Sequence, residues 1–130
     1  MSGKSGWIGV GLDGTLARYD IWRGPQHIGE PVPAMLERVK QWLSEGRDVR
    51  IFTARVYYPT LLTGRATLDE LARFAEYRQA KAAIQAWSIE HIGQILPITC
   101  TKDYGMVALY DNRCVQVEQN TGKILGVSLI

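Results

Sequence analysis

Short apolar runs alternate along the chain with segments of helical periodicity. The runs read WIGV at residues 7–10, DVRIFTAR at 48–55, LPITC at 96–100 and MVALYDN at 106–112. Each run is short and flanked by turn-forming or charged residues, which is typical of a buried strand. The pattern therefore predicts four strands.

The intervening segments repeat apolar positions at helical spacing. In residues 34–46 these positions form one face, with Pro33 near the start and Gly46 just past the end, as is usual for a helix. A second helix, with or without a break, is expected from about residue 68 to residue 91, because Thr67 and Glu70 have the spacing of a capping box. The residues expected to face the core are Met35, Leu36, Val39, Trp42 and Leu43 in the first helix and Leu71, Ala75, Ile84 and Trp87 in the second.

Two segments show neither pattern clearly. Residues 17–32 are rich in glycine and proline and are interpreted as a flap. Residues 115–130 alternate around a turn at Asn120, Thr121 and Gly122, which predicts a C-terminal β-hairpin. The order strand, helix, strand, helix, strand predicts an α/β fold with a mostly parallel central sheet, formed as one domain over residues 1–130.

Composition is that of an ordinary globular domain. The chain has 130 residues, of which 46% are hydrophobic and 22% charged, enough for one modest core. The net charge of +2 is too small to indicate nucleic-acid binding by itself. Cys100 and Cys114 lack metal-ligand spacing and are expected to be reduced thiols. The start, MSGKSG, does not resemble a signal peptide, and no apolar run approaches the ~20 residues of a membrane span. We therefore expect a cytoplasmic protein without a membrane partner.

Polar residues follow each predicted strand. Because the carboxyl ends of parallel strands meet at one edge of a sheet, these residues are expected to lie together at a ligand site. They are Gly11, Asp13, Gly14 and Thr15 after the first strand, Thr53 and Arg55 after the second, Thr101 and Lys102 near the third, and Asp111 and Asn112 after the fourth.

The loop after the first strand allows two interpretations. Gly9, Gly11 and Gly14 have the G-x-G-x-x-G spacing of a dinucleotide-binding turn, which requires a helix to open directly at the glycines. Glycine and proline follow within ten residues, and the Asp13 charge would repel a pyrophosphate, so this interpretation is disfavoured. The GKS at residues 3–5 has no strand before it and does not make a P-loop.

The second interpretation rests on four motifs in order. GLDGTL after the first strand, IFTAR after the second, Lys102, and YDN ending at Asn112 together resemble the haloacid dehalogenase (HAD) superfamily of phosphohydrolases. The resemblance covers residues 7 to about 117. It implies a three-layer Rossmann-like fold, a Mg²⁺ cofactor and hydrolysis of phosphomonoesters through an aspartyl-phosphate.

The resemblance also implies roles for individual residues. Asp13 matches the acid/base, and its main-chain carbonyl would also reach the metal. Thr53 and Lys102 match the groups that hold the phosphoryl group. Asp111 matches a metal ligand. Asn112, a further metal ligand, stands where the family often has a second acid, which weakens the support for the metal. Gly14 and Thr15 complete the first loop, while Arg55 would either contact substrate or pair with a carboxylate.

Gly11 is the largest departure from the family pattern. It stands where the nucleophilic aspartate belongs, and glycine has no side chain to form the covalent intermediate. We therefore predict a phosphatase architecture with little or no activity, either through an inactivating substitution or in a natural non-catalytic relative. A phosphate- or nucleotide-binding module is the main alternative.

The sequence indicates the class of substrate and a candidate partner. The flap is too short to be a cap domain, so the site is expected to be open, or covered by a partner subunit. An open site suits bulky phosphoesters such as nucleic-acid ends or phosphoproteins, and a small nucleotide is a further candidate. Trp22 in the flap is a candidate for stacking on a base or sugar, while His27 and His91 have no metal-ligand spacing. The hairpin is a candidate edge for a homodimer.

Overall fold

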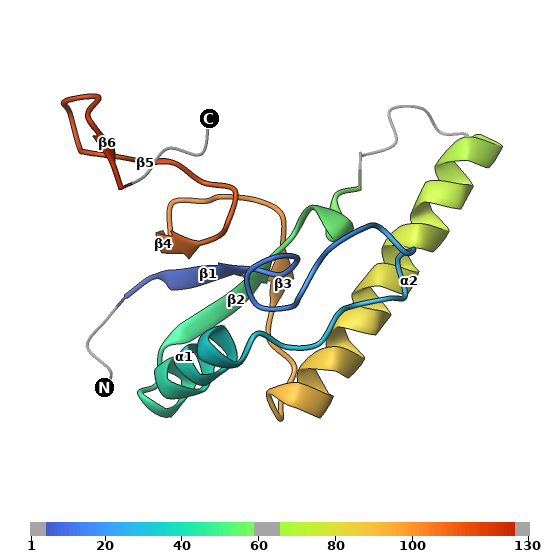
Figure 1. The fold of residues 1–130 in the computed structure, drawn as a ribbon. Coiled ribbons are helices and arrows are strands. Elements are labelled where there is room, and N and C mark those ends of the chain that lie inside the picture. Colours follow the sequence, from blue (N-terminus) through green and yellow to red (C-terminus); the bar gives the residue numbers. More distant parts are fainter. Residues whose placement is uncertain (1–4, 59–65, 127–130) are drawn as a thin grey trace.

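A parallel four-stranded sheet forms the centre of the molecule. The computed structural model describes residues 5–58 and 66–126. The sheet contains β1 (Trp7–Gly11), β2 (Asp48–Phe52), β3 (Ile98–Thr99) and β4 (Met106–Tyr110), in the order β3-β2-β1-β4. All three neighbouring pairs are parallel, so the predicted α/β class and the four strand positions are confirmed (Figure 1).

The register of β1 against β2 sets the hydrophobic core. Ile8 pairs with Val49 and Val10 with Ile51, so these four side chains share one face of the sheet. All four are buried in a single cluster that also receives side chains from both helices. The central strand β1 is buried along its whole length, which explains its continuous apolar sequence.

Helix α1 (Pro33–Ser44) follows the predicted pattern. Met35 and Val39 are buried, and Leu36, Trp42 and Leu43 are partly buried against the same core. Trp42 also packs against Tyr110 of β4, with ring centroids 4.8 Å apart. The helix starts with Pro33, whose fixed φ suits the first helical position.

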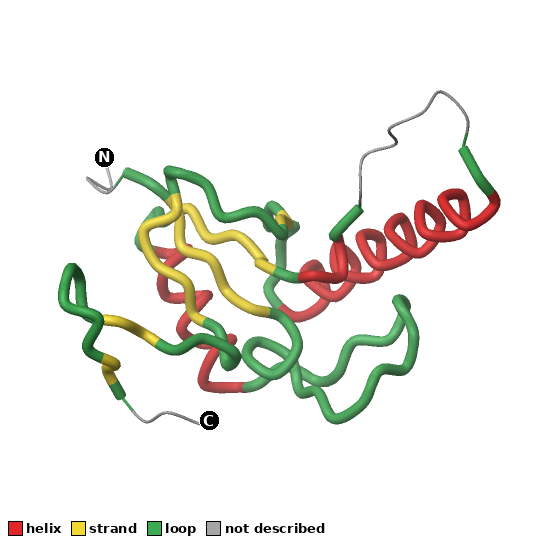
Figure 2. The backbone as a smooth tube through the Cα atoms, turned by 90° about the horizontal axis from the view of Figure 1, so that it is seen from above, coloured by secondary structure: helices red, strands yellow, loops and turns green. Residues whose placement is uncertain are grey.

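Helix α2 (Leu68–His91) is continuous, and its buried residues lie in its second half, while Tyr77 is partly buried against the core. Thr67 caps it, because the Thr67 side-chain oxygen accepts a hydrogen bond from the Glu70 amide at 3.1 Å. Ile84 and Trp87 are buried as predicted, but Leu71 is 53% exposed and Ala75 is also exposed, so these two predictions were wrong. The helix extends beyond the edge of the sheet, and its first turns have no sheet beneath them (Figure 2).

The described elements form two layers and not the three that the family resemblance implies. Both helices pack into the cluster on one face of the sheet. Within residues 5–58 and 66–126, the only other helical element is η1 (Ala54–Val56), a single turn at the end of β2. The chain returns from β3 to β4 through the short segment between them and not through a helix, so no third layer arises there.

The flap and the hairpin complete the described structure. The flap, residues 17–32, is closed at its base by hydrogen bonds from the Arg18 amide to the Glu30 carbonyl and from the Val32 amide to the Leu16 carbonyl, both 2.8 Å. Strands β5 (Gln116–Val117) and β6 (Ile124–Leu125) pair antiparallel in a separate two-stranded sheet. The predicted hairpin therefore has a paired centre, while its last four residues, 127–130, lie outside the described part of the chain, as does most of the GKS segment.

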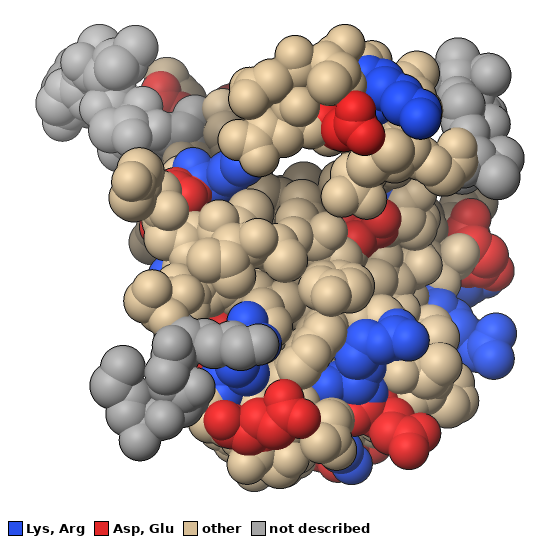
Figure 3. All heavy atoms as spheres, turned by 90° about the vertical axis from the view of Figure 1, so that its left-hand side faces the viewer, with Lys and Arg blue, Asp and Glu red and all other residues tan. Residues whose placement is uncertain are grey.

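No helix in the described ranges is both long enough and apolar enough to span a bilayer. Acidic and basic side chains are mixed on the face drawn in Figure 3. This distribution agrees with the small net charge of +2.

Candidate functional site

The loop after β1 is a tight turn and not the start of a helix. The Leu16 amide bonds the Gly11 carbonyl at 3.1 Å, and the Ala17 amide bonds the Leu12 carbonyl at 2.9 Å. Gly14 has a φ of +88°, a conformation that glycine adopts readily. The next helix begins only at Pro33. The dinucleotide-binding interpretation is therefore wrong, because in the described part of the chain no helix N-terminus faces the glycines.

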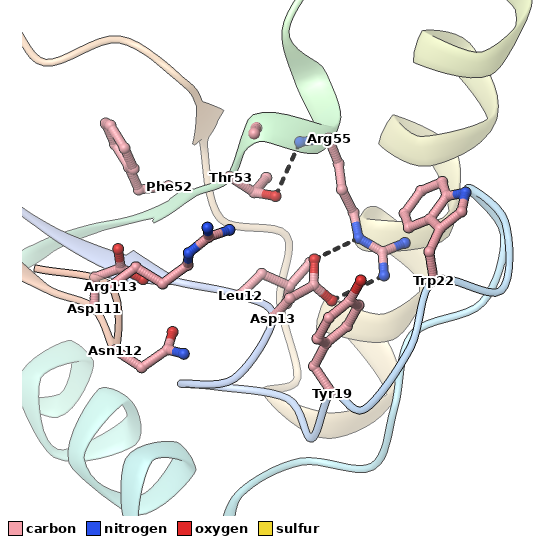
Figure 4. Close-up of a pocket in the computed structure, with 11 residues that line it drawn as sticks. Leu12, Asp13, Tyr19, Trp22, Phe52, Thr53, Arg55, Asp111, Asn112 and Arg113 are labelled. Carbon is pink, nitrogen blue, oxygen red and sulfur yellow. Dashed lines mark hydrogen bonds and ion pairs between the residues drawn. The ribbon is translucent and has the colours of Figure 1, made fainter. Parts of the chain in front are cut away.

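A cavity of about 450 Å³ lies at the carboxyl ends of β1, β2 and β4. This is the edge at which ligands bind in open parallel sheets. Its polar lining comes from the β1 loop, the end of β2, the end of β4 and the flap (Figure 4). The lining residues are Leu12, Asp13, Tyr19, Trp22, Phe52, Thr53, Ala54, Arg55, Asp111, Asn112 and Arg113.

Asp13 and Arg55 form a bidentate ion pair at the centre of the cavity. Nε of Arg55 donates to one carboxylate oxygen of Asp13 at 2.7 Å, and Nη2 donates to the other at 2.8 Å. The Arg55 side chain is 5% exposed and that of Asp13 23% exposed. Of the two roles considered for Arg55, the structure therefore shows the carboxylate pair.

Arg55 also fastens the flap over the site. Its guanidinium lies 4.8 Å from the centroid of the Trp22 ring, and its Nη1 donates to the Pro25 carbonyl at 3.4 Å. The buried hydroxyl of Thr53 accepts a hydrogen bond from the Arg55 amide at 3.1 Å, which fixes the turn of η1. Trp22 thus lies at the site as expected, with Arg55 against its ring.

Thr15 and Asn112 join the β1 loop to the end of β4. The Thr15 hydroxyl donates to the Asn112 side-chain oxygen at 3.0 Å and accepts from the Asn112 amide at 2.9 Å. The Asn112 side-chain nitrogen also lies 2.6 Å from the place that a Cβ on Gly14 would take. Asn112 is expected from the sequence to be a weak metal ligand, but its side-chain oxygen accepts the hydrogen bond from Thr15.

Gly11, at the end of β1, lies next to Asp111, which follows β4. A Cβ atom added to Gly11 would overlap the Oδ1 atom of Asp111 and lie 3.3 Å from the Thr15 hydroxyl. The Asp111 carboxylate therefore fills the space in which a side chain at position 11 would begin. Gly11 itself does not line the cavity, whereas Asp111 does.

Cys114 contacts the other oxygen of Asp111. Its thiol lies 3.6 Å from Oδ2 of Asp111 and donates to it. Burial and then the nearby Asp111 charge raise the pKa of the Cys114 thiol, while Lys102 acts in the opposite direction. Lys102 thus influences Cys114 electrostatically, although it does not line the cavity as the motif comparison implied. Both cysteines are free thiols, as expected.

Sequence reasoning missed two polar side chains of the cavity, Arg113 and Tyr19. Arg113 directly follows the YDN motif, so its position after β4 was a signal that it could reach the site. Figure 4 shows its guanidinium extending from the end of β4 into the cavity. Tyr19 comes from the flap, whose glycine- and proline-rich sequence gives no indication of where its side chains point.

The carboxylates of the site do not form a site for a divalent metal as they are arranged. Mg²⁺ binds oxygen ligands, commonly one or two carboxylates with water and phosphate. Both oxygens of Asp13 are bonded to Arg55, and the Asn112 oxygen is bonded to Thr15. Within residues 5–58 and 66–126, no three His, Cys, Asp or Glu side chains are grouped to hold a metal. The side chains of Asp13 and Asn112 are thus engaged elsewhere, while Mg²⁺ binding by the Asp13 main-chain carbonyl and Asp111 stays a prediction.

We found no match to this chain among protein-family models, curated proteins or solved structures. Any function must therefore be argued from the residues of the cavity.

Proposed function

We propose that this chain is a phosphatase scaffold of the HAD type, with strongly impaired hydrolysis of phosphomonoesters. One observation carries the proposal. A side chain at position 11 would start beside the Thr15 hydroxyl and against the carboxylate of Asp111, which lines the cavity. An aspartate there would add a carboxylate where the sequence motifs imply a nucleophile, and glycine supplies none.

The remaining residues are suited to holding a phosphorylated ligand. Arg113 and the hydroxyl of Tyr19 are polar groups of the lining, and Trp22 adds an aromatic surface that is 50% exposed. Aromatic rings stack on bases and sugars, so a nucleotide or a nucleic-acid end is the proposed ligand. The two free thiols agree with the proposed cytoplasmic location.

The test compares this chain with Gly11→Asp in a phosphate-release assay on an aryl phosphate, with and without Mg²⁺. We expect the aspartate variant to exceed this chain by at least about a hundredfold, since loss of a covalent nucleophile commonly costs far more than that. The Asp111 side chain must rotate to admit the new carboxylate, which a flexible terminal group can do.

Gly11→Asn is the matched control, because it has the shape of aspartate without a nucleophilic carboxylate. Turnover by Gly11→Asp but not by Gly11→Asn would support the proposal. Equal inactivity of both variants, with both folded, would rule out the hydrolase scaffold and favour the alternative, a module that binds phosphate without hydrolysing it.

A further inference from the structure

The acidic and basic side chains that line the cavity are equal in number, so their formal charges cancel. The lining contains two acids, Asp13 and Asp111, and two bases, Arg55 and Arg113. The Asp13 charge is neutralised directly by Arg55 through two short hydrogen bonds. The remaining pair is Asp111, held low against Gly11, and Arg113, which extends into the open space.

Arg113 is free to bind an anion. It makes no hydrogen bond or ion pair with any other residue in the ranges 5–58 and 66–126. Its guanidinium points into the cavity and not toward bulk solvent alone (Figure 4). Arginine presents several donors in a fixed plane and is well suited to phosphate oxygens.

The charges of the cavity do not require a metal cation to offset repulsion of an anion. A divalent cation offsets the repulsion between a phosphate and a group of carboxylates, but here only the Asp111 carboxylate is not neutralised by an ion pair. Oδ1 of Asp111 lies against Gly11, and Oδ2 of Asp111 accepts a hydrogen bond from Cys114. Each oxygen of this carboxylate therefore already has a neighbour within the protein. Lys102 adds a positive charge close enough to affect Cys114.

We propose that the cavity binds a phosphate group through Arg113 without a divalent cation. This inference concerns the same cavity as the proposed function and rests on its use for phosphorylated ligands. It assigns the recognition of the phosphate to a side chain outside the recognised motifs.

The experiment titrates the full chain with inorganic phosphate, followed by NMR of the backbone amides, in EDTA and in excess Mg²⁺. We expect the two dissociation constants to agree within about twofold, because the site uses no metal ligand. Arg113→Ala should weaken binding about tenfold or more, the loss of a charge-assisted contact of about 1.4 kcal/mol. Arg47→Ala is the matched control, since Arg47 precedes β2 and lies at the opposite edge of the sheet.

Binding that appears only with Mg²⁺ would overturn the inference, as would binding that survives Arg113→Ala or no binding at any phosphate concentration. A double variant, Gly11→Asp with Asn112→Asp, provides a positive test. It adds two carboxylates to a balanced lining, so phosphate binding should weaken at least about tenfold in EDTA and recover with Mg²⁺.

Failure of this inference is separable from failure of the proposed function. If Gly11→Asp hydrolyses phosphate esters while this chain binds phosphate only with Mg²⁺, the scaffold proposal stands and the metal-free site does not. If Gly11→Asp is inactive while this chain binds phosphate in EDTA, the metal-free site stands alone.

Discussion

Gly11 and Asp111 show how the absence of one side chain affects the groups around it. The Asp111 carboxylate lies in the space that a side chain at position 11 would enter. In this position it meets the Cys114 thiol, which contributes to the raised pKa of that thiol. A change in the charge of Asp111 should therefore change the pKa of the Cys114 thiol.

We predict that Asp111→Asn makes Cys114 more reactive toward iodoacetamide at neutral pH. The thiolate is the reactive form. Burial and the Asp111 charge raise the pKa of Cys114 above the ordinary thiol value of 9.0, so little thiolate is present at neutral pH. Removing the carboxylate charge lowers that pKa and should increase the alkylation rate by roughly threefold. The measurement is the rate of mass addition in a Cys100→Ser background.

Asp103→Asn is the control for that prediction. Asp103 lies before β4, where it accepts a hydrogen bond from the Trp7 indole at 2.8 Å, and it does not contact Cys114. An equal acceleration by both variants would show that general loosening, and not the Asp111 charge, governs the thiol.

The flap is an element that one side chain, Arg55, connects to the candidate site. Arg55 connects the β1 loop to the flap through Asp13, Trp22 and the Pro25 carbonyl. The flap contains no helix or strand. Its order comes from these contacts, from the hydrogen bonds at its base, and from the Trp87 indole, which donates to the Gly29 carbonyl at 2.9 Å.

We predict that Arg55→Ala lowers the free energy of unfolding by about 3 kcal/mol, because it leaves the partly buried Asp13 carboxylate without a partner. Hydrogen exchange of the flap amides should also become faster, since the stacking on Trp22 is lost. Urea unfolding and hydrogen exchange would measure the two effects.

Arg23→Ala is the matched control within the same flap. The pair between Arg23 and Asp20 is 49% and 71% exposed, and exposed pairs contribute less than about 1 kcal/mol. If both substitutions changed stability and exchange equally, Arg55 would have no special role in holding the flap.

At the scale of the whole molecule, the hairpin is separate from the central sheet. Its two strands pair only with each other among the described residues (Figure 1). The side chains of Val117 and Ile124 are exposed. An isolated two-stranded hairpin is marginally stable in water. Homodimerisation through this hairpin remains a prediction, and the exposed apolar side chains are consistent with it.

We predict that this chain is a dimer by light scattering and that Val117→Glu shifts it toward the monomer, because a charge would be buried between the two copies. Glu118→Gln, at the neighbouring position, is the control and should leave the mass unchanged. A monomeric mass for the unchanged chain at high concentration would contradict the prediction.

The sequence by itself determined the strands, the helices and the edge at which three of the four motifs meet. These follow from local periodicity, from glycine and proline positions and from the Thr67 cap, all of which act between near neighbours. The buried faces of β1, β2 and α1 were predictable for the same reason. Local pattern could not reveal that Leu71 and Ala75 lie on a part of α2 beyond the sheet, since helix periodicity does not state how far a sheet extends.

Only the tertiary structure decided how the site residues pair. Asp13 and Arg55 are 42 positions apart, and Thr15 and Asn112 are 97 apart. The same is true of the Asp111 carboxylate beside Gly11 and of Arg113 in the cavity. Hydrogen bonds and ion pairs act over a few ångströms, so distances between residues remote in the chain decide which groups are engaged and which remain free to bind a ligand.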